Sequence, residues 1–236
     1  MRVILLHGAW HGAWCWFQIE KMLNYSGINT IAVELPGHGI SKENPGNITL
    51  QNYVNIVDQI IDKKTIIVAH SMSGIVLSTL LEKYPDVTGV YLSAFAPANG
   101  KSLLDYAMTD IDSIAGKNLI VDEENKTVDI NRECIIDAFY NECDTMYHYL
   151  ARQLLTIEPL IPFTEKMVLG TKYKIAKKYY ISTLLDHAIS YDLQQQMIND
   201  NEIENIINIE TDHSMFFSNY KKLAKILYTI IKKNNE

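Results

Sequence analysis

The stretch Thr65-Ile66-Ile67-Val68-Ala69-His70-Ser71-Met72-Ser73-Gly74-Ile75 decides the fold. It opens with a short apolar run rich in β-branched residues, which is typical of a strand covered on both faces of a parallel sheet. Small side chains follow, and residues 72–84 then take the spacing of an amphipathic helix. A buried strand that passes directly into a helix is the repeating unit of α/β proteins.

The same alternation runs through most of the chain. Runs rich in Ile and Val predict strands at residues 3–6, 30–34, 65–69, 87–94, 178–182 and 203–209. Amphipathic segments predict helices at residues 14–26, 50–63, 72–84, 191–199 and 216–232. With right-handed crossovers, this order predicts an α/β protein with a doubly wound parallel sheet of about six strands, flanked by helices.

The alternation breaks between residues 99 and 177. Residues 118–121 and 127–130 could pair as a hairpin, and helical patterns follow at 132–140 and 145–154. Pro159 and Pro162 interrupt the next stretch. We therefore expect a mainly helical cap at 99–177, inserted after the fourth strand of a core formed by residues 1–98 and 178–236.

Charge and composition exclude several classes of function. The 236 residues include 21 Lys and Arg against 28 Asp and Glu, a net charge of −7. An acidic chain without a basic block is a poor candidate for binding nucleic acid or anionic membranes. No apolar run approaches the ~18 residues that span a bilayer, and the short run at 3–6 fits a strand better than a signal peptide.

The cysteines indicate a reducing compartment. Cys15, Cys134 and Cys143 form neither an even disulfide set nor a CxxC metal pair. We therefore expect free thiols in a cytoplasmic protein.

Ser71 is the candidate nucleophile. A tight strand–serine–helix turn is a nucleophile elbow, usually G-x-S-x-G, because only small residues fit two positions to either side of the serine. Here Ala69 and Ser73 occupy those positions. Such a turn strains the serine and exposes its hydroxyl above the sheet. The alternative is that Ser71 is an ordinary helix N-cap.

The loop after the first strand supports the elbow. Parallel topology brings Leu5-Leu6-His7-Gly8-Ala9-Trp10 to the same carboxyl edge of the sheet as Ser71. Gly8 allows close approach, and we expect the backbone amides of Ala9 and Met72 to bind a developing oxyanion.

His213 and Asp186 are the candidate base and acid. His213 follows the last strand and precedes the last helix, on the same edge as Ser71. The orienting carboxylate should lie between the nucleophile and the histidine in the chain. Residues 93–100 contain no acid, and Asp186 follows the fifth strand closely, whereas Asp192 is expected to begin a helix. Three other histidines fit the role less well, namely His7, His38 and His70.

Several motifs now form one pattern across nearly the whole chain. They are His7-Gly8-Ala9-Trp10-His11-Gly12-Ala13-Trp14-Cys15-Trp16, Leu35-Pro36-Gly37-His38-Gly39, Ala69-His70-Ser71-Met72-Ser73-Gly74, Tyr84-Pro85, Ala94-Phe95-Ala96-Pro97, Asp186-His187-Ala188-Ile189 and Asp212-His213. With them the sequence resembles the α/β-hydrolase superfamily, and more narrowly the plant methyl esterase and hydroxynitrile lyase group with its bacterial esterase relatives. The resemblance implies the α/β-hydrolase fold and a Ser71–His213–Asp186 triad.

At several positions this sequence differs from lyases and other enzymes of the superfamily, and these differences bear on which activity the resemblance implies. Lyases of the group carry a threonine after the first histidine and a lysine after the catalytic one, whereas Gly8 and Ser214 stand here. The resemblance therefore implies the esterase branch. Haloalkane dehalogenases and epoxide hydrolases of this fold use an aspartate nucleophile, which Ser71 argues against.

We accordingly expect a serine carboxylesterase that cleaves small to medium hydrophobic esters through an acyl-enzyme, without a metal or organic cofactor. The expected substrate pocket comprises Gly8, Trp10, His11, Phe139, Tyr147, Leu160, Ser214 and Met215. The inner face of the cap is expected to present Phe139, Tyr140, Tyr147, Leu150, Leu154, Leu160 and Phe163. The protein is expected to be a monomer or homodimer. Two alternatives remain open: a hydroxynitrile lyase or other carbon–carbon bond enzyme, and a non-catalytic small-molecule receptor.

Overall fold

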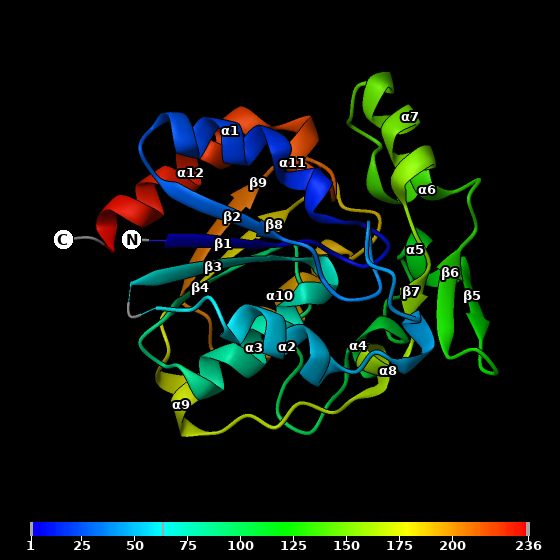
Figure 1. Ribbon diagram of the computed structural model, residues 1–236, viewed down its shortest axis with the longest axis horizontal. Helices are drawn as coiled ribbons and strands as arrows, with labels where there is room; N and C mark the ends of the chain where they lie inside the picture. The colour runs from blue at the N-terminus through cyan, green and yellow to red at the C-terminus, as the bar shows by residue number, and fades with distance from the viewer. Residues whose placement is uncertain (1, 63, 235–236) are drawn as a thin grey trace.

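A six-stranded parallel sheet forms the centre of the computed structural model, which describes residues 2–62 and 64–234 (Figure 1). All neighbouring strands in it run parallel. From edge to edge the strands are β2 (Asn29–Val33), β1 (Arg2–Leu6), β3 (Thr65–His70), β4 (Thr88–Leu92), β8 (Lys178–Thr183) and β9 (Asn205–Ile209). Every residue of β3, β4 and β8 is buried. The predicted parallel sheet is therefore confirmed.

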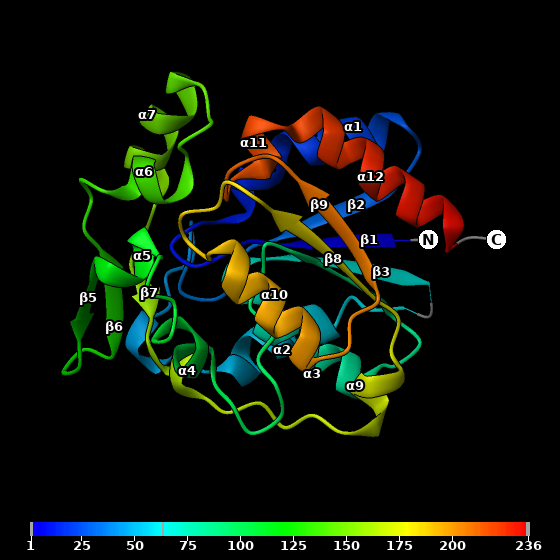
Figure 2. The same cartoon turned by 180° about the vertical axis from the view of Figure 1, so that it is seen from behind.

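Helices cover both faces of the sheet, as Figure 2 shows from behind. One layer contains α1 (Phe17–Tyr25), α11 (Met215–Ser218) and α12 (Tyr220–Lys233). The other contains α2 (Leu50–Asp58), α3 (Gly74–Lys83), α9 (Thr171–Ile175) and α10 (Tyr191–Asp200). The helix α12 buries one apolar stripe, which includes Leu223, Leu227 and Ile230, while its lysines stay in solvent.

Residues 103–164, which we call the cap, lie between β4 and β8 in the chain and beyond the carboxyl ends of the strands in space (Figure 1). Its elements are α4 (Leu103–Ala107), α5 (Ile114–Lys117), β5 (Leu119–Asp122), β6 (Thr127–Ile130), α6 (Ile135–Phe139), α7 (Thr145–Leu154), β7 (Glu158–Pro159) and α8 (Ile161–Thr164). The predicted hairpin is present as antiparallel β5 and β6. A short third strand, β7, was not predicted; Val128 pairs with Glu158 and Thr127 with Pro159.

Some helix ends differ from the predictions. The segment 216–232 is divided between α11 and α12, and 14–26 begins with a 3-10 turn, Ala13–Trp16. The helix expected at 50–63 ends at Asp58, and Lys63 lies outside the described residues. No helix of the described part of the chain is both long and apolar enough to cross a membrane.

Candidate active site

Ser71 lies at the turn between β3 and α3, in the first position of a 3-10 helix, Ser71–Ser73. Its φ is +53°, a left-handed conformation that is strained for a residue with a side chain. Ala69 is fully buried, and the buried Ser73 hydroxyl donates to the backbone carbonyl of His7. A Cβ at Gly74 would collide with the Phe95 carbonyl. Small residues therefore do fill this turn, and Ser73 ties it to the end of β1.

The loop after β1 lies directly against Ser71. A Cβ built on Gly8 would lie 2.7 Å from the Ser71 Cβ, so only glycine fits there. The Gly8 carbonyl accepts from His7 Nδ1 at 2.9 Å and from the His11 amide at 3.3 Å. Since the C=O and N–H of a peptide point in opposite directions, these donors turn the Ala9 N–H away from them. Within the described residues, neither the Ala9 nor the Met72 amide donates to a protein acceptor.

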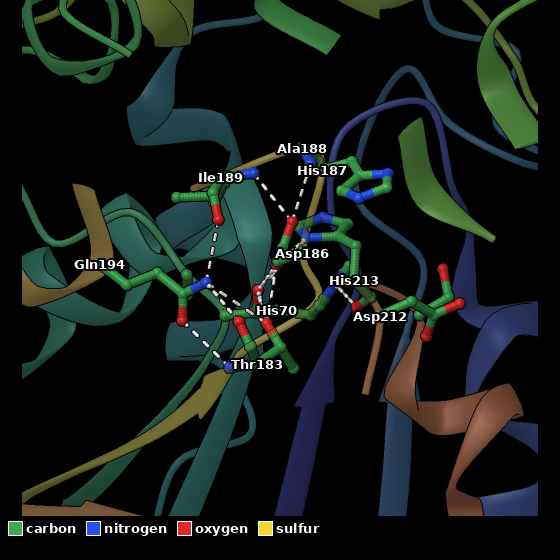
Figure 3. A network of polar contacts seen from close by, with 12 residues as sticks. His70, Thr183, Asp186, His187, Ala188, Ile189, Gln194, Asp212 and His213 are labelled. Atoms are coloured by element: carbon green, nitrogen blue, oxygen red, sulfur yellow. Dashed lines mark hydrogen bonds and ion pairs between the residues drawn. The ribbon is translucent and has the colours of Figure 1, made fainter. Parts of the chain in front are cut away.

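His213 and Asp186 form a buried pair, with 2.8 Å between His213 Nδ1 and Asp186 Oδ2 (Figure 3). The other carboxylate oxygen accepts from the Ala188 and Ile189 amides, each at 2.8 Å. Burial opposes ionisation of Asp186, but His213 and these hydrogen bonds outweigh it and hold the pKa of the carboxyl below its usual value. Asp186 therefore holds the His213 imidazole in one orientation, with Nδ1 toward the carboxylate.

A second serine, Ser93, joins this pair. Its hydroxyl donates to Asp186 Oδ2 and lies 3.2 Å from His213 Nδ1, and Thr183 Oγ1 lies 2.7 Å from the Ser93 oxygen. Ser93, His213 and Asp186 thus form one buried network. Sequence reasoning missed Ser93 because the loop after β4 was searched for acids only. Its position at the end of β4, on the catalytic edge, was the available signal.

Ser71 and Ser93 differ in their surroundings. Ser71 lines a cavity, whereas Ser93 is fully buried and meets His213 on the nitrogen that Asp186 already occupies. Among the hydrogen bonds of the described residues there is none between Ser71 and His213. His70 is not among the residues that line the cavity, and its Nε2 donates to the His213 carbonyl at 3.0 Å.

The cavity beside Ser71 is mostly apolar. The core contributes Ala9, Trp10, Met72 and Phe95, and the cap contributes, among others, Leu103, Leu119, Phe139 and Phe163. Two polar side chains of its wall are bonded within the protein: Asp110 accepts from the Ser190 amide at 2.8 Å, and Ser113 donates to the Ala188 carbonyl at 2.7 Å. No cluster of three or more metal-ligating side chains occurs within residues 2–62 and 64–234.

Of the expected pocket residues, Trp10 and Phe139 line this cavity and the others lie elsewhere. Gly8 is packed behind Ser71, and both His11 ring nitrogens are bonded to other groups. Tyr147 stacks on Phe217 with 4.3 Å between ring centroids. Ser214 and Met215 are fully buried and Leu160 is half-buried against the core, and none of the three lines the cavity. Of the residues expected on the inner face of the cap, Phe163 also lines the cavity, while Tyr140, Leu150 and Leu154 do not.

Comparison with known proteins shows which family the chain is similar to. The model of the alpha/beta hydrolase family matches residues 3–226. The chain belongs to this family. A putative chloroplastic methylesterase of Arabidopsis thaliana, number 11 of its series, is 31% identical over 96% of this chain and 63% of its own length. The chain spans only 56–63% of the first three such relatives. Methylesterase 7 of the same plant is 26% identical, with 98% of this chain and 96% of that protein covered.

Solved structures show the same fold. Tomato methylketone synthase I, complexed with 2-tridecanone, has a TM-score of 0.85 at 23% identity and covers 99% of this chain and 98% of its own. An extracellular α/β-hydrolase from a Paenibacillus species has a TM-score of 0.82 at 24% identity, over 97% of this chain and 98% of its own. The α/β-hydrolase fold with an insertion between β4 and β8, and the relation to plant methylesterases, are thus confirmed.

Proposed function

We propose that the protein is a serine esterase in which Ser71 attacks small to medium hydrophobic carboxylic esters. One observation carries the proposal: a serine in a strained left-handed turn lines an apolar cavity beside the backbone amides of Ala9 and Met72, which have no acceptor among the residues that the structure describes. A strained backbone conformation of this kind persists only where the surrounding structure enforces it, and such conformations are concentrated at active sites. Free amides at such a position are the elements of an oxyanion hole.

The proposed reaction uses His213 as the base. Asp186 holds Nδ1 of His213, which leaves Nε2 to take the proton of Ser71 as its oxygen attacks the ester carbonyl. The oxyanion of the tetrahedral intermediate is bound by the Ala9 and Met72 amides. The imidazolium then protonates the leaving alcohol, and the same residues activate a water that releases the acid from the acyl-enzyme.

Ser93 is assigned a supporting role in this proposal. It is fully buried, it is not among the residues that line the cavity, and its hydroxyl donates to Asp186, so its oxygen is poorly placed to attack a substrate carbonyl. Together with Thr183 at 2.7 Å, it stabilises the charged form of the Asp186 carboxylate.

The substrate class follows from the cavity wall. Among the described residues that form the wall there is no Lys, Arg or His, and Asp110 carries the one charged side chain. A neutral acyl group suits this wall better than an anionic one. The methylesterase relatives favour methanol as the leaving alcohol. A cytoplasmic location, action without a cofactor, and a monomeric or homodimeric state stay predictions.

Hydrolysis assays test the proposal. p-Nitrophenyl acetate, p-nitrophenyl butyrate and methyl esters of apolar acids are offered to the wild-type protein and to Ser71→Ala and Ser93→Ala. We expect Ser71→Ala to lower kcat by at least about 10⁴-fold, and Ser93→Ala to retain most of the activity. Full activity in Ser71→Ala would overturn the assignment. Cyanide release from a cyanohydrin would favour a lyase instead, and ligand binding without turnover would favour a receptor.

A further inference from the structure

A fully buried carboxylate of the cap reaches the loop beside the proposed nucleophile. Glu158 in β7 accepts the Trp10 amide on Oε2 at 2.8 Å, and the same oxygen lies 2.6 Å from His38 Nε2. Its other oxygen accepts the Tyr53 hydroxyl at 3.2 Å. Trp10 directly follows Ala9, so this contact joins the cap to the residue next to the proposed oxyanion donor.

The hydrogen-bond partners of His38 fit an imidazolium that faces an ionised Glu158. Its Nδ1 lies 3.1 Å from the Pro36 carbonyl, which only accepts, and its Nε2 meets the Glu158 carboxylate. Opposite an ionised Glu158, both nitrogens therefore donate. Burial opposes the charge, but the Glu158 carboxylate outweighs it and raises the pKa of His38. By contrast, His7 Nε2 accepts from the Leu35 amide at 3.1 Å, so that ring is neutral.

The peptide between Ala9 and Trp10 is held at both ends. Its N–H donates to Glu158, and its carbonyl accepts from His11 Nδ1 at 2.7 Å. The other nitrogen of His11 accepts from the hydroxyl of Tyr140, a cap residue, at 2.7 Å. Trp10 has a φ of +62°, a conformation that a residue with a side chain adopts only under constraint.

We propose that Glu158 is a positioning residue for the oxyanion hole. By holding the N–H of the Ala9–Trp10 peptide, it keeps Trp10 in its strained conformation and the Ala9 amide aimed at the carbonyl that Ser71 attacks. The inference rests on the proposed esterase function. It assigns to the cap a part in catalysis besides covering the substrate, because β7 supplies the group that completes the loop.

Two substitutions of similar size separate positioning from charge pairing. Glu158→Gln keeps the length and a carbonyl oxygen for the Trp10 amide but loses the charge. Glu158→Asp keeps the charge but is one methylene too short to reach that amide. We expect Glu158→Gln to stay within about 3-fold of the wild-type kcat and Glu158→Asp to lose about 10–100-fold, with KM changed less than about 3-fold in both.

Inhibitor affinity provides the readout that a merely structural role would not move. A trifluoromethyl ketone adds to the serine and forms an oxyanion, whereas the matching methyl ketone binds largely without addition. Glu158→Asp should lower the ratio of trifluoromethyl to methyl ketone affinity in parallel with kcat. The matched control Tyr53→Phe removes only the hydroxyl on the other carboxylate oxygen, and should leave this ratio unchanged.

The outcomes are distinct. The inference would be wrong if Glu158→Asp were more active than Glu158→Gln. It would also be wrong if the affinity ratio were unchanged in Glu158→Asp. Either result would mean that the His38–Glu158 pair only stabilises the fold. Circular dichroism establishes whether each variant is folded. If Glu158→Gln does not fold, the ratio of trifluoromethyl to methyl ketone affinity in Glu158→Asp still tests the inference. A wild-type protein that neither hydrolyses esters nor binds the trifluoromethyl ketone would instead contradict the proposed function.

Discussion

At the scale of single residues, the site combines a strained serine with a carboxylate that has no free oxygen. Asp186 accepts from two backbone amides on one oxygen and from His213 and two hydroxyls on the other. A carboxylate with so many donors cannot rotate, which fixes the His213 ring that it holds. The proposed chemistry therefore depends on the shape and charge of this one side chain.

Replacing Asp186 by asparagine should lower kcat about 10³–10⁴-fold with little change in KM, because an amide NH₂ facing His213 Nδ1 imposes the wrong tautomer. The measurement is p-nitrophenyl butyrate hydrolysis. Asp192→Asn, at the exposed first turn of α10, is the matched control and should keep wild-type activity. A loss below 10-fold in Asp186→Asn would remove Asp186 from the proposed triad.

At the scale of elements, the ends of β1 and β3 are packed so closely that the loop after each restricts the other. Ser73 in the elbow donates to the His7 carbonyl, and Gly8 lies against the Ser71 side chain. The oxyanion loop and the nucleophile are therefore positioned as one unit.

Gly8→Ala tests this packing. The new Cβ would lie 2.7 Å from Ser71 Cβ and 2.8 Å from His70 Nδ1, so the loop or the elbow must shift. We expect kcat to fall at least about 100-fold, and the free energy of unfolding to fall by about 1–3 kcal/mol. Gly170→Ala is the control, because the nearest neighbours of its Cβ would be atoms of the Glu82 carboxylate, at 3.3 Å and beyond. An active, stable Gly8→Ala variant would show that the loop does not touch the nucleophile.

The sequence indicated the elements whose side chains repeat with a period, and it missed those that do not. The β3–Ser71–α3 turn and the pairing of Asp186 with His213 were found, because their places at strand ends follow from topology. The strand β7 has two residues and a proline, so it carries no periodicity. The His38–Glu158 pair joins residues 120 positions apart, a separation that no local pattern encodes. The cavity wall depends on how the cap packs, which explains why several expected pocket residues lie elsewhere.

At the scale of the whole molecule, several buried histidines link stability to pH. Burial lowers the pKa of His7, His11 and His70, in His11 to about 3. In the unfolded chain they would titrate near ~6.5. Their contribution to stability is therefore complete above that pH, and is lost as the pH falls toward the folded pKa. The raised pKa of His38 acts in the opposite direction, since its contribution is lost as the pH rises through the folded value.

Urea unfolding at pH 7 and pH 5 should show this linkage. Each of the three neutral histidines contributes a slope of about 1.4 kcal/mol per pH unit below pH ~6.5, so the free energy of unfolding should fall steeply. His11→Gln should make the slope shallower by about 1.4 kcal/mol per pH unit, whatever its effect on stability at pH 7. The same slope in His11→Gln and in the wild-type protein would mean that His11 is not kept neutral by the fold.

The position of a covalent label tests the central claim most directly. A fluorophosphonate reacts with an activated serine nucleophile, and peptide mapping by mass spectrometry then identifies the modified residue. We predict a single adduct on Ser71, no labelling of Ser71→Ala, and labelling of Ser93→Ala at Ser71. An adduct on Ser93, or labelling of Ser71→Ala at the wild-type rate, would contradict the account.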